Sequence, residues 1–231
     1  MRLAYTDSGL HDPTVAAALD SLHAAAKRDR RVFASLLPRV LFGALRGRSA
    51  FESAQPHLKN AFIPVSREHG AFMYAVARAA RARLIVEFGS SFGISTIYLA
   101  AAARANGGRV IGTEIEPVKI AGARRNIADA GLSAFADIRE GDALESLAPL
   151  QGPIDFLFLD GWKTLYLPVL KMLEPQLAPN AIVMADNIRT FRKSLAPFVD
   201  YVRDPANLYE TTILPFESGV TFSIWRGAVS S

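Results

Sequence analysis

The chain has 231 residues, a net charge of +4 and no cysteine, and 50% of its residues are apolar, which suffices for a buried core. None of its four histidines lies beyond position 69, so a Cys/His zinc site or a histidine-based catalytic triad cannot be built from the rest of the chain alone. A metal ion held there would need oxygen ligands, which favours Mg²⁺, Mn²⁺ or Ca²⁺.

Residues 1–59 are predicted to form a helical extension in front of a single α/β domain over residues 60–231. Asp12 followed by Pro13 is typical of a helix start. Apolar residues then recur at helical spacing, at Val15, Leu19, Leu22 and Ala26.

An apolar stretch flanked by arginines, residues 27–48, follows this helix. We interpret it as a helix that packs on the core or on the partner subunit of a homodimer, and peripheral contact with a membrane is the alternative. The stretch is too short and too interrupted to span a bilayer. The basic excess of the chain falls in its first third, but no recognition motif accompanies it, so we expect no nucleic-acid partner. The lack of a signal-peptide pattern and of cysteine favours a cytoplasmic protein.

After the extension, apolar runs of strand type alternate with helical segments. A helix is predicted from Ser66, as its cap, to about Ala82, with Phe72, Val76 and Ala80 on one face. Strands are predicted at 83–88, 109–114, 136–139, 154–159 and 181–185, helices at 93–104, 117–130, 166–173 and 190–202, and two last strands at 208–214 and 220–225. This alternation predicts a doubly wound α/β fold with a seven-stranded, mostly parallel, Rossmann-like sheet that closes on an antiparallel C-terminal hairpin.

The first predicted strand leads into a glycine-containing turn with Glu87, Gly89 and Gly93. Glycines between a strand and a helix let a ligand approach the backbone closely. The spacing G-x-x-x-G differs from the dinucleotide pattern G-x-G-x-x-G, and a carboxylate two residues before the first glycine suits a cationic or amine-bearing ligand. By itself this signal is weak.

Acidic residues also end the second and third strands. Glu114 is placed to accept the hydroxyls of a ribose, and Asp142 could reach the edge of an adenine. Each could instead cap the helix that follows. Glu116, just before Pro117, fits the capping position better and would leave Glu114 free for a ligand.

The fourth and fifth strands end in Asp160 and in Asp186-Asn187. Because neighbouring parallel strands end at the same edge of a sheet, these residues are expected to meet there and to offer the oxygen ligands that Mg²⁺ prefers. Strand-end caps are the alternative. Lys163 could act as a general base near a metal-bound oxygen, and Trp162 could pack against a ligand. Taken singly, they could be a surface lysine and a packing residue.

Together these residues resemble the class I S-adenosylmethionine-dependent O-methyltransferases, and within that class the metal-dependent catechol and caffeoyl-CoA O-methyltransferases. The segment FLDGWKTLYLP, residues 158–168, is especially similar to the catechol branch. The resemblance covers about residues 60–226. It departs at Gly161, where catechol enzymes often carry a histidine, and near residues 212–219, which do not align cleanly.

The resemblance implies S-adenosylmethionine as cofactor, Mg²⁺ (or Mn²⁺ or Ca²⁺) held by Asp160, Asp186 and Asn187, and Lys163 as the catalytic base. The implied cofactor contacts are Val65, Glu87, Gly89, Ser91, Gly93, Ser95, Glu114, Ile115, Asp142, Asp160 and Trp162. The implied acceptor contacts are Trp162, Lys163, Asn187 and, in the poorly aligned segment, Glu217.

The expected reaction is transfer of a methyl group from S-adenosylmethionine to one hydroxyl of a catechol-like, vicinal dihydroxy aromatic small molecule. The metal ion would hold both oxygens and Lys163 would remove a proton. The alternatives are a non-catechol hydroxyl or an amine as acceptor, or a binding protein without catalysis. Residues 12–60 are expected to cover the acceptor pocket and to help form the dimer, and His57 and His69 could touch the acceptor.

Overall fold

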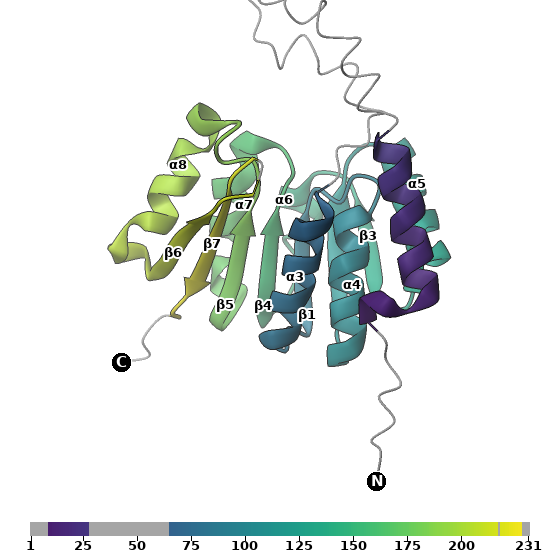
Figure 1. Ribbon diagram of the computed structural model, residues 1–231. Helices are drawn as coiled ribbons and strands as arrows, with labels where there is room; N and C mark the ends of the chain where they lie inside the picture. The colour runs from purple at the N-terminus through teal and green to yellow at the C-terminus, as the bar shows by residue number, and fades with distance from the viewer. Residues whose placement is uncertain (1–8, 28–64, 217, 228–231) are drawn as a thin grey trace, which may run out of the picture.

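A computed structural model describes residues 9–27, 65–216 and 218–227 of the chain (Figure 1). The arginine-flanked stretch, His57 and Glu217 lie outside the described residues, so the expectations about them stay predictions. None of the helices in the described ranges combines the length and the apolar character that crossing a bilayer requires.

Seven strands form one sheet in the order β3-β2-β1-β4-β5-β7-β6. The strands are β1 Leu84–Phe88, β2 Arg109–Glu114, β3 Ala136–Glu140, β4 Ile154–Leu159, β5 Leu177–Ala185, β6 Tyr209–Leu214 and β7 Val220–Trp225. The first five pair in parallel, and β7 is antiparallel to both β5 and β6. The predicted fold class and the C-terminal hairpin are therefore confirmed.

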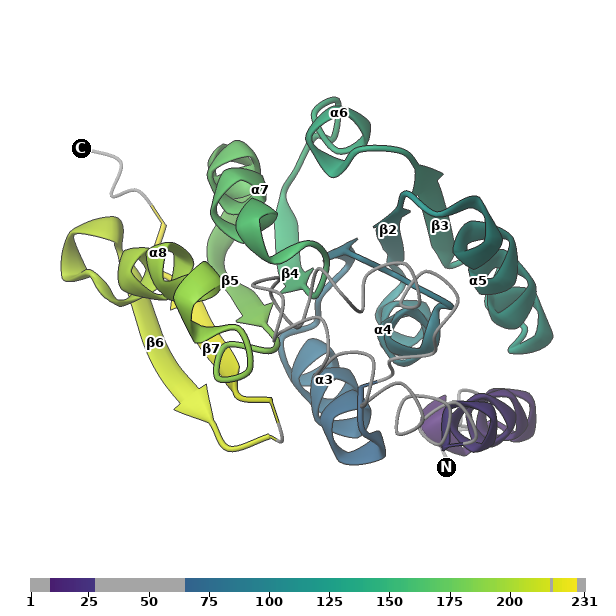
Figure 2. The ribbon, with the colours of Figure 1, turned by 90° about the horizontal axis from the view of Figure 1, so that it is seen from above.

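Helices cover both faces of this sheet (Figure 2). The α-helices are a helix over residues 13–27, α3 Arg67–Ala79, α4 Ile94–Asn106, α5 Pro117–Asp129, α6 Ala143–Ser146, α7 Tyr166–Leu173 and α8 Arg192–Arg203. Short 3₁₀ turns lie at Gly9–His11, Lys163–Leu165, Glu174–Gln176 and Pro205–Asn207. The first four α-helices lie on one face, and α6, α7 and α8 lie on the other.

The central strand β4 shows how the sequence builds two cores. Side chains alternate between the faces of a strand. Phe156 and Phe158 accordingly pack with the core under α3 and α4, while Leu157 and Leu159 pack with the core under α7 and α8. All four are fully buried, which explains why the strand reads as one continuous apolar run.

The chain order of the strands reverses between β1 and β4. From β1 the chain runs outward through β2 to β3, and from β4 it runs the other way to β5. In open α/β sheets, ligands bind in the crevice outside the carboxyl ends of the strands at such a switch point. The carboxyl ends of β1 and β4 are therefore the place to look for a site.

The described part of the N-terminal extension packs on the α3–α4 face. Asp12 caps its helix as predicted, because its Oδ1 accepts the Thr14 N–H at 2.9 Å. Val15, Leu19 and Leu22 are buried in the same core as α3 and α4. Arg104 of α4 adds an ion pair with Asp12 at 3.3 Å, so this helix is anchored at its first turn.

The buried face of α3 is not the face on which the sequence placed Phe72, Val76 and Ala80. Met73 and Ala77 are fully buried, whereas Ala80 is exposed and lies beyond the last helical residue. The helix packs along α4, where a Cβ on Gly70 would lie 2.4 Å from the ring of Tyr98. This close approach turns the Met73 side inward and leaves Phe72 partly buried.

Two turns approach each other closely at the switch point. A Cβ on Gly89, which follows β1, would lie 2.4 Å from the Cα of Gly161, which follows β4. Gly89 also has a φ of +93°, which L side chains rarely adopt. The two strand-end turns are thus in backbone-to-backbone contact.

Gly89→Ala is expected to lower the free energy of unfolding by about 1–3 kcal/mol, because the methyl group must push two backbones apart. Urea unfolding followed by circular dichroism measures this change. Gly107→Ala is the matched control, since Gly107 has a φ of +69° but a Cβ there would have no neighbour within 4 Å. Equal losses in both variants would mean that strain at φ alone, and not the contact with Gly161, destabilises the protein.

Candidate functional site

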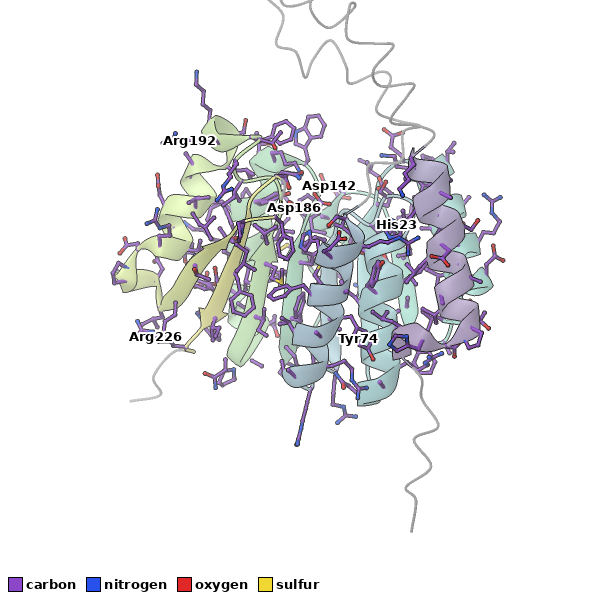
Figure 3. All side chains as sticks on the ribbon, viewed as in Figure 1. His23, Tyr74, Asp142, Asp186, Arg192 and Arg226 are labelled. Atoms are coloured by element: carbon purple, nitrogen blue, oxygen red, sulfur yellow. The ribbon has the colours of Figure 1, made fainter. Side chains whose placement is uncertain are left out.

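The strand-end residues singled out in the sequence gather at the carboxyl edge of the sheet. Figure 3 places Asp142 and Asp186 at this edge, above the ends of their strands. Asp160 and Asp186 directly follow two neighbouring strands, because Leu159 of β4 pairs with Ala185 of β5. The hydrogen bonding between the two strands continues one residue beyond the end of β5, because the Asp186 N–H donates to the Leu159 carbonyl at 3.0 Å.

Glu87 is a fully buried carboxylate at the end of β1. Its Oε2 accepts the hydroxyl of Ser90 at 2.6 Å and the hydroxyl of Thr96. Its Oε1 has no hydrogen-bond partner among the described residues. Burial raises the pKa of Glu87, and the nearby Glu114 carboxylate adds to this shift. A buried acceptor without a donor is costly, so this oxygen suits a ligand that brings an N–H or an ammonium group.

Glu114 joins the turn after β1 to the turn after β2. Its Oε2 accepts the Ser91 N–H at 2.9 Å, and its Oε1 accepts the N–H groups of Ile115 and Glu116 at 2.8 and 3.0 Å. Glu116 occupies the N-cap position of α5, but its side chain makes no capping hydrogen bond. The expectation that Glu116 caps the helix and leaves Glu114 free is therefore wrong, because Glu114 itself takes the backbone donors of the turn.

The turn between β1 and α4 is shaped by three residues in left-handed conformations. Their φ angles are +93° for Gly89, +47° for Ser91 and +84° for Gly93. Ser95, in the first turn of α4, is buried, as is Val65 just before α3. The predicted glycine turn thus exists, with two further candidate residues beside it.

Apolar side chains stand exposed around the same edge. Ile115, after β2, is 63% exposed, and Trp162, after β4, is 45% exposed. Large apolar groups in solvent next to polar strand ends offer surface to a flat ligand. Asp142, after β3, caps α6, because its Oδ1 accepts the Leu144 N–H at 2.8 Å. Its capping interpretation is confirmed, and its second carboxylate oxygen is left for another donor.

Lys163 ties the ends of β4 and β5 together. Its Nζ donates to Asp160 Oδ1 at 3.1 Å and to the hydroxyl oxygen of Tyr166 at 2.8 Å. The Tyr166 hydroxyl in turn donates to the Asp186 carbonyl at 3.3 Å. Tyr166 is fully buried, so this chain of contacts fixes the position of the lysine nitrogen beside Asp160.

Asp160 is electrostatically destabilised as an anion. Burial raises its pKa to about 7, the carboxylates of Asp186 and Glu87 add to the rise, and Lys163 opposes it. A bound cation would relieve this repulsion between carboxylates. The two aspartates and the side-chain oxygen of Asn187 form a hard, oxygen-only donor set, which fits Mg²⁺ or Mn²⁺.

Asp186 is held from three directions, and two of them were not predicted. Its Oδ1 accepts the N–H of Asn187 at 2.5 Å and the hydroxyl of Ser218, which lies between β6 and β7. Its Oδ2 lies 3.7 Å from Nδ1 of His69, in the first turn of α3. Burial lowers the pKa of His69, and the Asp186 carboxylate opposes that shift.

The structure therefore brings the predicted residues into two adjoining groups. Glu87, Gly89, Ser91 and Glu114 are linked around the turns after β1 and β2. Asp160, Lys163 and Asp186 are linked after β4 and β5, with Asn187 following Asp186. Within the described ranges, no three His, Cys, Asp or Glu side chains cluster as metal ligands, so the second group depends on the amide of Asn187.

Comparison with known proteins gives a consistent family. Residues 86–188 match a family described as a methyltransferase domain. A catechol O-methyltransferase of Niastella koreensis is 35% identical over 130 residues, which are 54% of this chain and 58% of that protein. A catechol O-methyltransferase of Mycobacterium tuberculosis is 33% identical over 127 residues, 54% of this chain and 57% of that protein. The chain thus spans less than two-thirds of the length of these curated relatives.

A solved structure supports the same assignment. The O-methyltransferase from Bacillus cereus, crystallised in complex with SAH, superposes with a TM-score of 0.65 at 25% identity. The match covers 70% of this chain and 82% of that one.

Proposed function

Because the chain carries a class I methyltransferase domain, we propose that it transfers a methyl group from S-adenosylmethionine to one hydroxyl of a catechol-like aromatic molecule, with a divalent metal ion. The observation that carries this proposal is the cluster of Asp160, Lys163 and Asp186 next to the buried carboxylate of Glu87. Asp160 and Asp186 suit a bound cation, and Lys163 suits the role of proton acceptor. The Glu87 carboxylate suits an amine-bearing cofactor.

For the cofactor, the residues present fit S-adenosylmethionine, which supplies the methyl group when bound. The free Oε1 of Glu87 would accept the ammonium group of its methionine part. Ile115 and Trp162 offer exposed apolar surface to the adenine, and Asp142 offers an oxygen to its edge. Val65, Ser95 and the turn from Gly89 to Gly93 would enclose the methionine part.

Glu114 can accept fewer hydrogen bonds from the ribose than the sequence suggested. An ionised carboxylate accepts about four hydrogen bonds, and three at Glu114 already come from backbone N–H groups. Glu114 can therefore accept one ribose hydroxyl without giving up a backbone donor. The same carboxylate would then hold the turn between β1 and α4 and bind the cofactor.

For the acceptor, Asp160, Asp186 and Asn187 would hold a divalent ion, which when bound lowers the pKa of a coordinated hydroxyl. Lys163 Nζ is the atom placed to take up the proton, since it lies beside Asp160 and is fixed by Tyr166. The aromatic side chains of Phe191 and Trp162 would flank the acceptor ring, and the Phe191 ring centroid lies 5.6 Å from Lys163 Nζ. The chain thus positions the acceptor and removes its proton.

The three isomers of dihydroxybenzene test this proposal directly. Purified full-length protein with S-adenosylmethionine and Mg²⁺ should methylate the 1,2-isomer once, because only adjacent oxygens can share one metal ion. The 1,3- and 1,4-isomers, with the same composition, are matched controls and should react little. Equal methylation of all three, or of aniline, detected by mass spectrometry, would contradict the acceptor class. Cofactor binding without any methylated product would support a binding protein instead.

Glu114→Gln is expected to raise the dissociation constant for S-adenosylmethionine about tenfold, because a charge-assisted hydrogen bond to the ribose is lost. Isothermal titration calorimetry measures the constant. Glu116→Gln, which removes the neighbouring charge at the start of α5, is the matched control and should bind normally. Unchanged affinity of the Glu114 variant would show that the carboxylate holds the turn only.

A further inference from the structure

His69, which the sequence suggested could touch the acceptor, is a buried imidazole to which the proposed reaction gives no role. It lies in the first turn of α3 with 3% of its surface exposed. Its ring stacks on Phe216 at a centroid distance of 4.7 Å and meets the edge of Phe158 at 5.8 Å. Aromatic packing alone would be served as well by a phenylalanine, so the ring nitrogens need another reason.

The ring nitrogens point to the Asp186 carboxylate. Nδ1 lies 3.7 Å from Asp186 Oδ2, while Nε2 has no hydrogen-bond partner among the described residues. With one proton on the ring, that proton belongs on Nδ1, where it faces an acceptor. The distance is about 0.7 Å longer than a typical N–H···O hydrogen bond, so the two atoms make an electrostatic contact and not a hydrogen bond.

The opposite oxygen of Asp186 is already fixed. Oδ1 accepts the Asn187 N–H and the Ser218 hydroxyl. Polar groups thus face the Asp186 carboxylate from its own chain neighbour, from the β6–β7 turn and, through His69, from α3. Loss of a group that orients a metal-binding carboxylate typically lowers metal affinity by about 10–100-fold.

We propose that His69 is a positioning residue that orients the Asp186 carboxylate for metal binding, with Ser218 acting on the other oxygen. This inference rests on the proposed metal site. The segment that begins α3 would then serve both the metal site and the cofactor site. Val65, which would contact the cofactor, lies four residues before His69 on this segment. The approach of the cofactor and the orientation of the metal ligand would then both depend on how α3 packs.

Mn²⁺ binding to the full-length protein, followed by electron paramagnetic resonance of the free ion, tests the proposal without any turnover. His69→Phe keeps the ring between Phe216 and Phe158 but removes the donor, and it should raise the dissociation constant for Mn²⁺ about 10–100-fold. His69→Asn, whose amide nitrogen lies near the place of Nδ1, should recover part of the affinity. Urea unfolding in EDTA shows whether each variant is as stable as the parent protein.

Two further variants separate the possible outcomes. Met73→Leu alters another fully buried side chain of α3 and should bind Mn²⁺ normally. If His69→Phe binds within twofold of the parent, or no more weakly than Met73→Leu, the positioning role is wrong. Asp186→Asn should abolish binding; if it does not, the metal site itself is wrong, which is a failure of the proposed function and not of His69 alone. Should His69→Phe fail to fold in EDTA, His69→Gln, whose amide nitrogen lies near the place of Nε2, is compared with His69→Asn: weaker Mn²⁺ binding by His69→Gln would support the role of a donor at Nδ1, and equal binding by the two variants would overturn it.

Discussion

Replacing Lys163 by methionine is expected to lower the turnover number for catechol methylation by about 10²–10⁴-fold, the usual contribution of a general base. Methionine keeps the length of the side chain but cannot accept a proton. The affinity for S-adenosylmethionine should stay close to that of the parent, because Lys163 lies on the acceptor side of Asp160 and contacts Tyr166 and Phe191. Steady-state kinetics and calorimetry measure the two quantities separately.

A milder change supplies the comparison for this variant. Tyr166→Phe removes the hydroxyl that accepts from Lys163 Nζ at 2.8 Å, while the ring stays buried. The lysine keeps its contact with Asp160, so turnover should fall by less than in Lys163→Met. If Lys163→Met retains full turnover while the cofactor still binds, the lysine is not the base. If Tyr166→Phe costs more than Lys163→Met, the tyrosine would have to act on the acceptor itself.

Removing the metal ion is expected to lower the rate by about 10³-fold or more, because a metal ion stabilises a developing oxyanion by several kcal/mol. Excess EDTA should abolish methylation, and Mg²⁺ should restore it. Asp160→Asn should reproduce the loss without a chelator, since the amide keeps the shape of the side chain but not its charge. Methylation of the 1,2-isomer in single-turnover conditions is the measurement.

Asp204→Asn is the control for the metal experiment. Asp204 follows α8, where its Oδ1 accepts the Ala206 N–H at 2.9 Å, and it belongs to neither group of strand-end residues. Its variant should keep both the activity and the sensitivity to EDTA. Methylation that continues unchanged in EDTA would contradict metal dependence. The rate enhancement would then have to come from Lys163 and from the positioning of the acceptor.

The strand-end carboxylates could be predicted because local sequence carries their signal. β4 is buried on both faces and reads as one apolar run that ends sharply at Asp160. β5 begins earlier than predicted, at Leu177, because its first residues include Pro179 and Asn180, which read as a loop. Asn180 has a φ of +65°, and the register with β4 shifts between Ile154 and Phe156, so this part of the strand is irregular.

The partners of those carboxylates could not be predicted. Ser218 and His69 come from segments far from Asp186 in the chain, and only the packing of α3 and of the β6–β7 turn brings them together. The three backbone donors at Glu114 were missed for a related reason, since the conformation of the turn decides where its N–H groups point. Sequence patterns indicate which residues reach the edge of a sheet, and tertiary structure decides what they meet there.

The backbone contact between Gly89 and Gly161 would fix the distance between the methyl donor and the acceptor even when the acceptor changes. The turn at Gly89 would carry the methyl donor and the turn at Gly161 the metal ligand Asp160, so the span between donor and acceptor is set by peptide geometry and not by flexible side chains. Holding reactants at a fixed separation is a large part of the rate that an enzyme supplies. Substitutions at Phe191, which would flank the acceptor ring, could therefore exchange one aromatic acceptor for another while the distance that the methyl group must travel stays the same.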